Sequence, residues 1–219
     1  SPERLMTDRI LDYLKSKVNL SLIAIDEAHC VSVWGNDFRP EYVALGKLKE
    51  IFPTVPTIAL TATADSSTQQ DIIKQLRLRD APLYLSSFER SNITTSAAPG
   101  QKRIEQILSF VKLRKGQAGI VYCLSRKSTE SVADRLAGKG YKALAYHAGI
   151  PGAERASIQR KFQNDEIDII CATIAFGMGI DKPNIRFVIH YNLPKNIEAY
   201  YQEIGRAGRD GADSEALLF

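Results

Sequence analysis

The sequence contains little cysteine and no long hydrophobic run. Its three cysteines, Cys30, Cys123 and Cys171, are far apart and form no CxxC pair. This pattern argues against a disulfide framework and against a zinc site, and it favours the reducing environment of the cytosol. No apolar run approaches the roughly 20 residues that a transmembrane helix needs, so we expect neither a membrane span nor a membrane partner.

The sequence also lacks an initiator methionine and a signal-peptide pattern, since it begins with Ser-Pro-Glu-Arg. We therefore expect a fragment of a longer protein. Neither sign of charge dominates: a net charge of +4 over 219 residues permits a nucleic-acid partner without requiring one. The hydrophobic content of 44% is that of an ordinary globular protein with ample core.

Short apolar runs alternate with helical patterns along most of the chain, which predicts an α/β protein with parallel sheets covered by helices. One such block fills residues 1–91 and a second fills residues 101–219, while the polar segment 92–100 is predicted to be a linker. We expect the strand at 20–25, rich in Ile and Leu, to be buried on both faces. The other predicted strands are 57–60, 83–85, 119–123, 143–146, 167–173 and 187–190.

Two carboxylates, Asp26 and Glu27, directly follow the predicted strand 20–25. Ligands of open α/β sheets bind at the carboxyl ends of strands, and adjacent carboxylates there suit Mg²⁺, which prefers oxygen ligands. On this interpretation Asp26 holds the metal, directly or through water, and Glu27 polarises an attacking water. The alternative is that the pair only caps the following turn.

An aromatic-rich segment comes next. Trp34, Phe38 and Arg39 are separated by glycine, asparagine and aspartate and are followed by proline, so we expect them on a loop. Aromatic faces with an arginine equip a loop to stack on unpaired bases. The alternative is that Trp34 and Phe38 anchor the loop to the core.

Small hydroxyl residues follow the predicted strand 57–60. Thr61 and Thr63 are suited to bind phosphate or to link a nucleotide-facing carboxylate to a neighbouring loop. The alternative is that Thr63 or Asp65 caps the next helix.

The second block carries three further candidate segments. Ser125 and Arg126 stand between a strand and a helix, where a phosphate of a nucleic-acid backbone is favoured, although a solvated helix start explains them as well. Thr173 is placed to bind a strand phosphate, and the glycines of the segment that follows, among them Gly179, let the backbone approach a ligand. Asp181 is suited to reach a ribose hydroxyl or to orient an arginine.

Arg206 and Arg209 are three residues apart, so we expect both on one face of a helix. Two guanidinium groups held together suit a polyphosphate whose charge grows during phosphoryl transfer. The alternative is an exposed pair that bridges to Glu203 or Asp210.

These segments together resemble the RecQ family of superfamily 2 DNA helicases. DEAHCVSVWGNDFRPEY resembles motif II and its aromatic-rich loop, TATAD motif III, AFGMGIDKP motif V and QEIGRAGRDG motif VI, while the segment at Ser125 is similar to motif IV. The motifs stand in the family's order over essentially all 219 residues. The resemblance implies two RecA-like lobes, the first incomplete at its N-terminus, and an ATP-dependent 3′-to-5′ DNA helicase of repair and recombination.

The resemblance also implies a role for each candidate residue, with ATP and Mg²⁺ as cofactors. Asp26 would hold Mg²⁺, Glu27 would be the catalytic base, Arg209 the arginine finger, and Arg206 its support or part of the coupling. Nucleotide coupling is implied for His29, Thr61, Thr63, Gly179 and Asp181, and DNA contact for Trp34, Phe38, Arg39, Ser125, Arg126 and Thr173. We expect His147 and His190 to be structural histidines.

The implied partners are single-stranded and partly duplex DNA, together with a single-stranded-DNA-binding protein that docks on regions outside this chain. The implied location is the bacterial cytoplasm, at the nucleoid.

The sequence departs from the family in one respect, because it contains neither the glutamine motif nor the phosphate-cradling loop GxxxxGK[ST]. We therefore expect these 219 residues alone to be inactive in ATP hydrolysis. A second interpretation is a module that binds single-stranded nucleic acid without hydrolysing ATP. A third is an RNA-directed DEAH-type helicase, against which the aromatic-rich loop argues.

Overall fold

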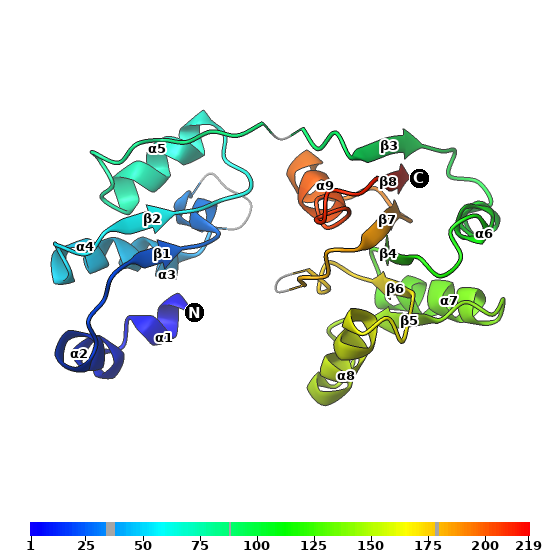
Figure 1. Cartoon of the computed structure of the whole chain (residues 1–219), viewed down its shortest axis with the longest axis horizontal. Coiled ribbons are helices and arrows are strands. Elements are labelled where there is room, and N and C mark those ends of the chain that lie inside the picture. The colour runs from blue at the N-terminus through cyan, green and yellow to red at the C-terminus, as the bar shows by residue number, and fades with distance from the viewer. Residues whose placement is uncertain (34–37, 88, 178–179) are drawn as a thin grey trace. The chain divides into compact units, whose positions relative to one another are not determined.

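The computed structural model describes residues 1–33, 38–87, 89–177 and 180–219. The chain forms two compact units, Ser1–Ser87 and Phe88–Phe219, and Figure 1 labels their elements. Among the residues with a described placement, no helix is both long and apolar enough to span a membrane.

The first unit is built on two short parallel strands, β1 (Ile23–Ile25) and β2 (Thr57–Ala59). Ile25 pairs with Ala59, so the carboxyl ends of both strands meet at one edge. The helical segments are α1 (Pro2–Leu5), α2 (Asp8–Lys17), η1 (Ala28–Val31), α3 (Pro40–Val43), η2 (Ala44–Lys47), α4 (Leu48–Ile51) and α5 (Ser66–Gln75), of which η1 and η2 are 3-10 helices.

Helices cover one face of this small sheet. Ile25 is buried in a cluster with Leu11 of α2, Leu48 of α4 and Ile72 of α5. On the other face Ala24 is exposed, and Ile58 of the neighbouring strand is 42% exposed. The expectation that strand 20–25 is buried on both faces is therefore wrong within this chain, because the described helices pack only on the side of Ile25.

The second unit is a six-stranded sheet in the order β3-β8-β7-β4-β6-β5 (Figure 1), and every pairing in it is parallel. Its strands are β3 (Ile93–Ala97), β4 (Ala118–Tyr122), β5 (Ala143–Tyr146), β6 (Ile169–Ala172), β7 (Ile185–His190) and β8 (Ser214–Leu218). Its helices are α6 (Arg103–Lys112), α7 (Arg126–Ala137), α8 (Gly152–Gln163) and α9 (Ile197–Ile204). The predicted α/β fold is confirmed.

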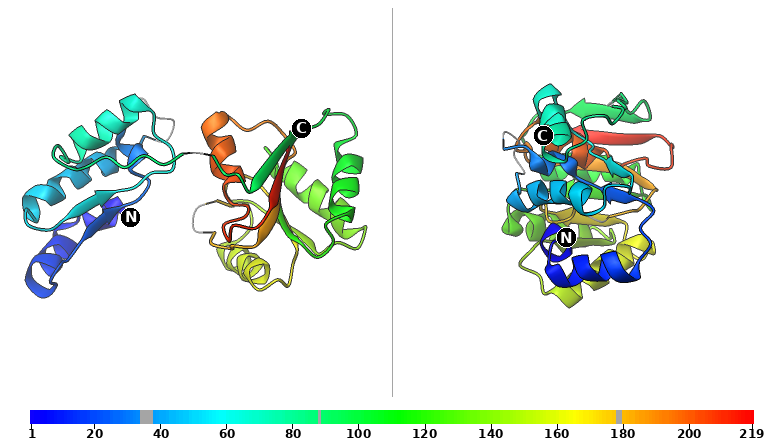
Figure 2. Two further views of the ribbon diagram at one scale, coloured as in Figure 1. Left: turned by 45° about the horizontal axis from the view of Figure 1, so that its top comes forward. Right: turned by 90° about the vertical axis from the view of Figure 1, so that its left-hand side faces the viewer.

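Helices cover both faces of this sheet because successive residues of its central strands point to opposite sides. Ile120 of β4 packs in a cluster with Phe162 of α8 and Ile204 of α9. Its neighbour Val121 packs in a second cluster, with Leu136 and other residues of α6 and α7. The left view of Figure 2 shows α6 and α7 in green on one side of the sheet, and α8 and α9 in yellow and orange on the other.

Two predicted segments differ from the structure. The segment 92–100, predicted to be a linker, contains β3, which pairs with β8 along Ile93–Ala97. This strand lies at the edge of the sheet and buries only Ile93, so its sequence has no run of apolar residues. The predicted strand 83–85 does not form: Tyr84 is 87% exposed, and no described strand pairs with the segment.

Gly119 in β4 lies against the ring of Phe187, and a Cβ atom at this position would overlap the ring. We expect Gly119→Ala to destabilise the second unit by about 1–3 kcal/mol, because Phe187 is fully buried and its displacement would strain the core. Gly152→Ala is the matched control, since a Cβ there meets nothing within 4 Å. Denaturant unfolding measures both changes, and equal midpoints for the two variants would contradict this packing.

Candidate functional site

The acidic pair lies where β1 ends. The N–H of Glu27 donates to Oδ1 of Asp26 at 2.8 Å, and the N–H of Ala28 donates to the carbonyl of Leu60 at 2.9 Å. Glu27 is left-handed, with φ 52° and ψ 40°, a conformation that costs a residue other than glycine on the order of 1–3 kcal/mol. The fold thus holds Glu27 in a strained backbone conformation at the edge where the two strands end.

These carboxylates fit a hard divalent cation. Asp26 is exposed, and only its Oδ1 accepts a hydrogen bond from a described residue. Mg²⁺ needs only one or two carboxylates when waters and phosphates complete its shell. The described residues contain no group of three or more His, Cys, Asp and Glu side chains that could hold a metal. The pair therefore fits a cation shared with a bound ligand better than a closed metal site.

His29 connects the acidic segment to the segment after β2. Its Nδ1 lies 2.8 Å from the hydroxyl of Thr61, and that hydroxyl lies 2.9 Å from the carbonyl of Thr63. Which of His29 and Thr61 donates depends on the tautomer of the imidazole ring. Glu27 Oε2 lies 3.6 Å from the same nitrogen. Two predicted coupling residues, His29 and Thr61, are therefore in contact, and Thr63 contributes its backbone.

Two further contacts hold this site against α5. Ser32, which is fully buried, donates its hydroxyl to Oδ2 of Asp71 at 2.7 Å. Asp65 caps α5 by accepting the N–H of Thr68 at 2.8 Å, and this hydrogen bond is the main cause of the lowered pKa of Asp65. The alternative that Asp65 caps the helix is thus correct. The Ser32 contact was not predicted, because nothing in the sequence pattern joins positions 32 and 71.

The aromatic-rich segment is described only in part, since Trp34 lies outside the described residues. Phe38 is 37% exposed. Arg39 is also partly exposed, and its Nη2 pairs with Oε1 of Glu3 at 2.5 Å while its guanidinium lies 5.2 Å from the centre of the Tyr42 ring. An exposed ion pair of this kind is easily exchanged for another anion. Phe38 and Arg39 are therefore both accessible to a ligand from solvent.

In the second unit, Ser125, Arg126 and Thr173 lie at the carboxyl edge of the sheet. Tyr122 at the end of β4 pairs with Ala172 at the end of β6, so the segments that follow them start side by side. Ser125 caps α7, because its hydroxyl accepts the N–H of Ser128 at 3.0 Å. The exposed Arg126 begins the helix. A hydroxyl, a helix N-terminus and a cation together favour a phosphate at this edge.

The segment 173–184, which we call the crossing loop, runs from one edge of the sheet to the other. It begins after β6 at the carboxyl edge and ends before β7, which starts at the amino edge because both strands are parallel to β4. Gly179 of this loop lies outside the described residues. The crossing loop therefore links Thr173 at the carboxyl edge to Asp181 near the amino edge.

Both candidate arginines contact the crossing loop. Arg206 is 9% exposed, and its Nη1 donates to the carbonyl of Gly177 at 2.5 Å. Arg209 is more exposed, and its Nη1 lies 3.0 Å from the carbonyl of Ile180 and 3.4 Å from Oδ1 of Asp181. The prediction that the arginines share a face of a helix is wrong, because α9 ends at Ile204 and a turn follows it.

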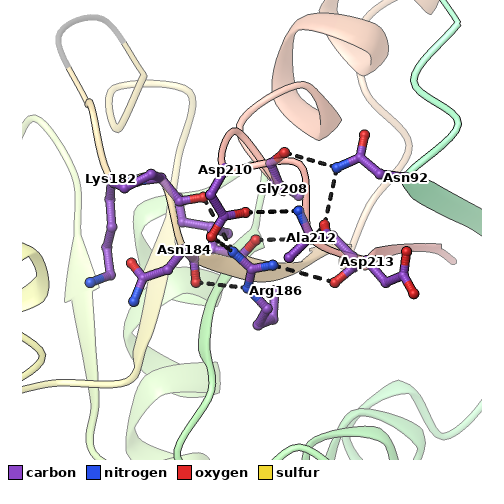
Figure 3. Close-up of polar contacts among 12 residues, drawn as sticks. Asn92, Lys182, Asn184, Arg186, Gly208, Asp210, Ala212 and Asp213 are labelled. Atoms are coloured by element: carbon purple, nitrogen blue, oxygen red, sulfur yellow. Dashed lines mark hydrogen bonds and ion pairs between the residues drawn. The ribbon is translucent and has the colours of Figure 1, made fainter.

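A dense set of hydrogen bonds holds this turn in place. Asn92 donates its side-chain N–H groups to the carbonyls of Gly208 at 2.8 Å and Ala212 at 3.0 Å (Figure 3). Arg186 pairs with Asp210, also drawn in Figure 3, and this contact is the main cause of the lowered pKa of Asp210. Gly208 combines a φ of 57° with close neighbours, since a Cβ there would overlap the side-chain nitrogen of Asn92. These contacts thus hold the backbone on both sides of Arg209.

The two histidines of the second unit pair with carboxylates. Nε2 of His190 lies 2.7 Å from Oε2 of Glu203, and both side chains are buried. Nε2 of His147 lies 3.0 Å from Oε1 of Glu130. Next to His190, Tyr122 donates its hydroxyl to the carbonyl of Phe176 at 2.9 Å, and burial raises the pKa of that hydroxyl. These contacts agree with the structural role expected for both histidines.

We expect Gly208→Ala to destabilise the second unit far more than Gly211→Ala. Both glycines have positive φ, so both substitutions carry the same kind of backbone strain, of about 1 kcal/mol or more. Only at Gly208 would a Cβ meet its neighbours, at 2.8 Å from the carbonyl of Ala212 and from the hydroxyl of Ser214. The midpoints of thermal unfolding measure the difference. If Gly211→Ala were equally destabilising, the turn would not be as tightly packed as these contacts require.

Two helicase families match most of the chain. Residues 101–211 match the family described as helicase conserved C-terminal domain, and residues 2–72 match the DEAD/DEAH box helicases. Curated relatives include the ATP-dependent DNA helicase RecQ of Pasteurella multocida, 52% identical over 100% of this chain and 34% of its own length. The protein of the same name from Haemophilus influenzae is 52% identical over 100% of this chain and 35% of its length. The chain spans about a third of the length of these two relatives.

Solved helicase structures have the same fold. The Mycobacterium smegmatis helicase Lhr, bound to ssDNA and AMP-PNP, is 21% identical with a TM-score of 0.74, covering 100% of this chain and 31% of its own. Dbp5 of Saccharomyces cerevisiae, bound to RNA and ADP BeF3, is 19% identical with a TM-score of 0.70, covering 96% of this chain and 56% of its own. These matches confirm the two RecA-like helicase lobes. The chain belongs to the RecQ family of DEAD/DEAH-box helicases.

Proposed function

We propose that this chain is part of an ATP-dependent DNA helicase and that it couples ATP hydrolysis to 3′-to-5′ movement along single-stranded DNA. The observation that carries the proposal is the contact of His29 with Thr61, which joins the acidic pair after β1 to the segment after β2. The RecQ relatives are ATP-dependent DNA helicases, which supports ATP and DNA as the substrates. By the same resemblance, we propose a role in repair and recombination in the bacterial cytoplasm, at the nucleoid.

In the first unit, the proposed chemistry is the attack of water on the terminal phosphate of ATP. Asp26 is the residue that would hold Mg²⁺, and a bound Mg²⁺ supplies positive charge that neutralises the phosphate oxygens. Glu27 orients the attacking water and accepts its proton. The hydrogen bond from its N–H to Oδ1 of Asp26 holds the Asp26 carboxylate next to the left-handed backbone of Glu27. A movement of the Glu27 carboxylate would shift His29, and through its contact with Thr61 the segment after β2.

In the second unit, we assign the arginine finger to Arg209. Only one of its terminal nitrogens contacts described residues, so the other donors are open to a phosphate. An arginine finger contributes about 10³–10⁵ to the rate in well-studied nucleotidases. Arg206 is largely buried on the carbonyl of Gly177, so we assign it to coupling through the crossing loop. Asp181 orients Arg209, the second of the two roles considered for it.

DNA binding is assigned to two surfaces. In the first unit, exposed Phe38 and partly exposed Arg39 supply an aromatic face and a cation, with Trp34 as the further stacking residue that the sequence proposes. In the second unit, Ser125, Arg126 and Thr173 bind backbone phosphates at the carboxyl edge. We further propose that a single-stranded-DNA-binding protein docks outside these residues.

A second candidate function applies to the 219 residues on their own. They contain no GxxxxGK[ST] segment, the motif that cradles the β- and γ-phosphates. We propose that this chain alone binds single-stranded DNA but does not hydrolyse ATP. ATP turnover by the isolated chain would contradict this assignment.

The assignment of Glu27 is tested by Glu27→Gln in the full-length helicase. We expect DNA-stimulated ATP turnover to fall by about 10²–10⁴, because glutamine cannot accept the proton. Affinity for single-stranded DNA is expected to stay unchanged. A steady-state phosphate-release assay and a DNA-binding titration measure the two quantities.

Asp12→Asn is the matched control for this experiment, since Asp12 is an exposed carboxylate of α2 in the same unit and lies outside the motifs. It removes the same charge at a distance from the acidic pair in sequence and is expected to leave turnover unchanged. Normal turnover of the Glu27→Gln protein would rule out Glu27 as the base.

A further inference from the structure

A positively charged pocket lies on the second unit, between the start of α6 and α7. Its volume is about 340 Å³, far more than the 10–15 Å³ or so that one water molecule needs. It is therefore large enough for a hydrated phosphate group. Its charged and polar lining residues are Lys102, Arg103, Glu105, Ser131, Arg135 and Tyr191. The lining therefore carries three positively charged side chains and one negatively charged side chain.

Arg103 is the fixed cation of this pocket. Its Nη1 donates to the carbonyl of Tyr191 at 2.9 Å, and its guanidinium lies 5.3 Å from the centre of the Tyr191 ring. Its Nε is buried and has no partner among the described residues. Because Nη1 holds the guanidinium in place and Nη2 has no hydrogen bond to a described residue, the group can bind an anion with little loss of side-chain entropy.

Lys102 and Arg135 add positive charge that the described part of the chain does not neutralise. Both side chains are exposed, and neither has an ion-pair partner among the described residues. Lys102 has a left-handed backbone, with φ 50° and ψ 39°, a conformation found more often at functional sites. The pocket therefore keeps an excess of positive charge.

The pocket belongs to the same edge of the sheet as the proposed phosphate contacts of α7. Tyr191 directly follows β7, and its N–H donates to the carbonyl of Tyr122 at the end of β4 at 2.9 Å. The N–H of Leu124 donates to Oδ1 of Asn192 at 3.2 Å. The segment that leads to Ser125 therefore contacts the segment that forms one wall of the pocket.

We propose that this pocket binds a backbone phosphate of single-stranded DNA, beyond those bound near Ser125 and Arg126. The inference rests on the proposed DNA-binding function and adds a site to it. Arg103 and Arg135 contact the phosphate oxygens through their guanidinium groups, and Lys102 adds a mobile charge. The site reads no base sequence, because it contacts only the backbone.

The test is the affinity of this 219-residue chain for a single-stranded oligonucleotide, measured by fluorescence anisotropy over a range of salt concentrations. The double variant Lys102→Gln with Arg135→Gln is expected to bind about 3- to 10-fold more weakly at low salt. The slope of log K against log salt is expected to become less steep by about 0.7, the value for one phosphate contact on a single strand. Arg103 is left in place because it also contacts Tyr191.

The matched control is Arg160→Gln with Lys161→Gln, which removes two exposed cations from the last turn of α8. We expect its affinity to stay within about twofold of wild type. Both double variants substitute exposed residues, so unchanged thermal unfolding is expected for each. Equal affinities of the two double variants would overturn the proposal.

Arg126→Gln separates this inference from the proposed function. If Arg126→Gln weakens binding and the Lys102 and Arg135 double variant does not, the pocket assignment alone is wrong. If the wild-type chain does not bind the oligonucleotide, the proposed function and the pocket assignment both fail. NMR of the Arg103 Nε–H distinguishes DNA from free phosphate: a shift with oligonucleotide is expected. A shift with inorganic phosphate but none with the oligonucleotide would overturn DNA as the source.

Discussion

A largely buried guanidinium on a loop carbonyl is the contact on which the second lobe depends. Parallel strands force the crossing loop to run from the carboxyl edge, where β6 ends, to the amino edge, where β7 begins. Arg206 holds this loop at Gly177, and Arg209 holds it again at Ile180. Since both arginines come from one hydrogen-bonded turn, we propose that a displacement at either edge reaches the other through this turn.

In the first lobe, a shorter set of contacts connects the segment after β1 to the segment after β2. The acidic pair and Thr61 follow two paired strands, so they meet at one edge. His29 bridges them through the contact of its Nδ1 with the Thr61 hydroxyl. The strained backbone of Glu27 lies at the centre of this arrangement. Both lobes thus connect a candidate phosphate-handling group to a neighbouring segment through side-chain contacts to backbone or hydroxyl oxygens.

Sequence reasoning succeeded where local patterns carry the information. The apolar runs of the second lobe predicted its central strands, and the hydroxyl of Ser125 was recognised at the start of a helix. Sequence reasoning failed where a partner distant in sequence decides whether a segment forms a strand or where a side chain binds. β3 looks like a linker because an edge strand with polar residues is stabilised by β8, about 120 residues later. The hydrogen-bond partners of Ser32 and Arg206 could not be predicted either, because no sequence periodicity relates each residue to its partner.

In the candidate site too, the sequence predicted which residues take part but not how they are packed. Sequence motifs selected Asp26, Glu27, Arg206 and Arg209, because residue type and order carry that information. The motifs could not predict that Arg206 is largely buried while Arg209 remains more exposed, since burial depends on packing against the crossing loop. The structure therefore distinguishes the two arginines by burial, which the motifs do not predict.

The most direct test of this account is amide hydrogen exchange of the chain with and without single-stranded DNA. If Arg206 links the two edges, DNA bound at the carboxyl edge should slow exchange both at the start of the crossing loop, near Thr173, and in the turn at 205–210. Replacing Arg206 with glutamine should leave the first effect and remove the second. Protection confined to the carboxyl edge in the wild-type chain would contradict the coupling proposed for the crossing loop.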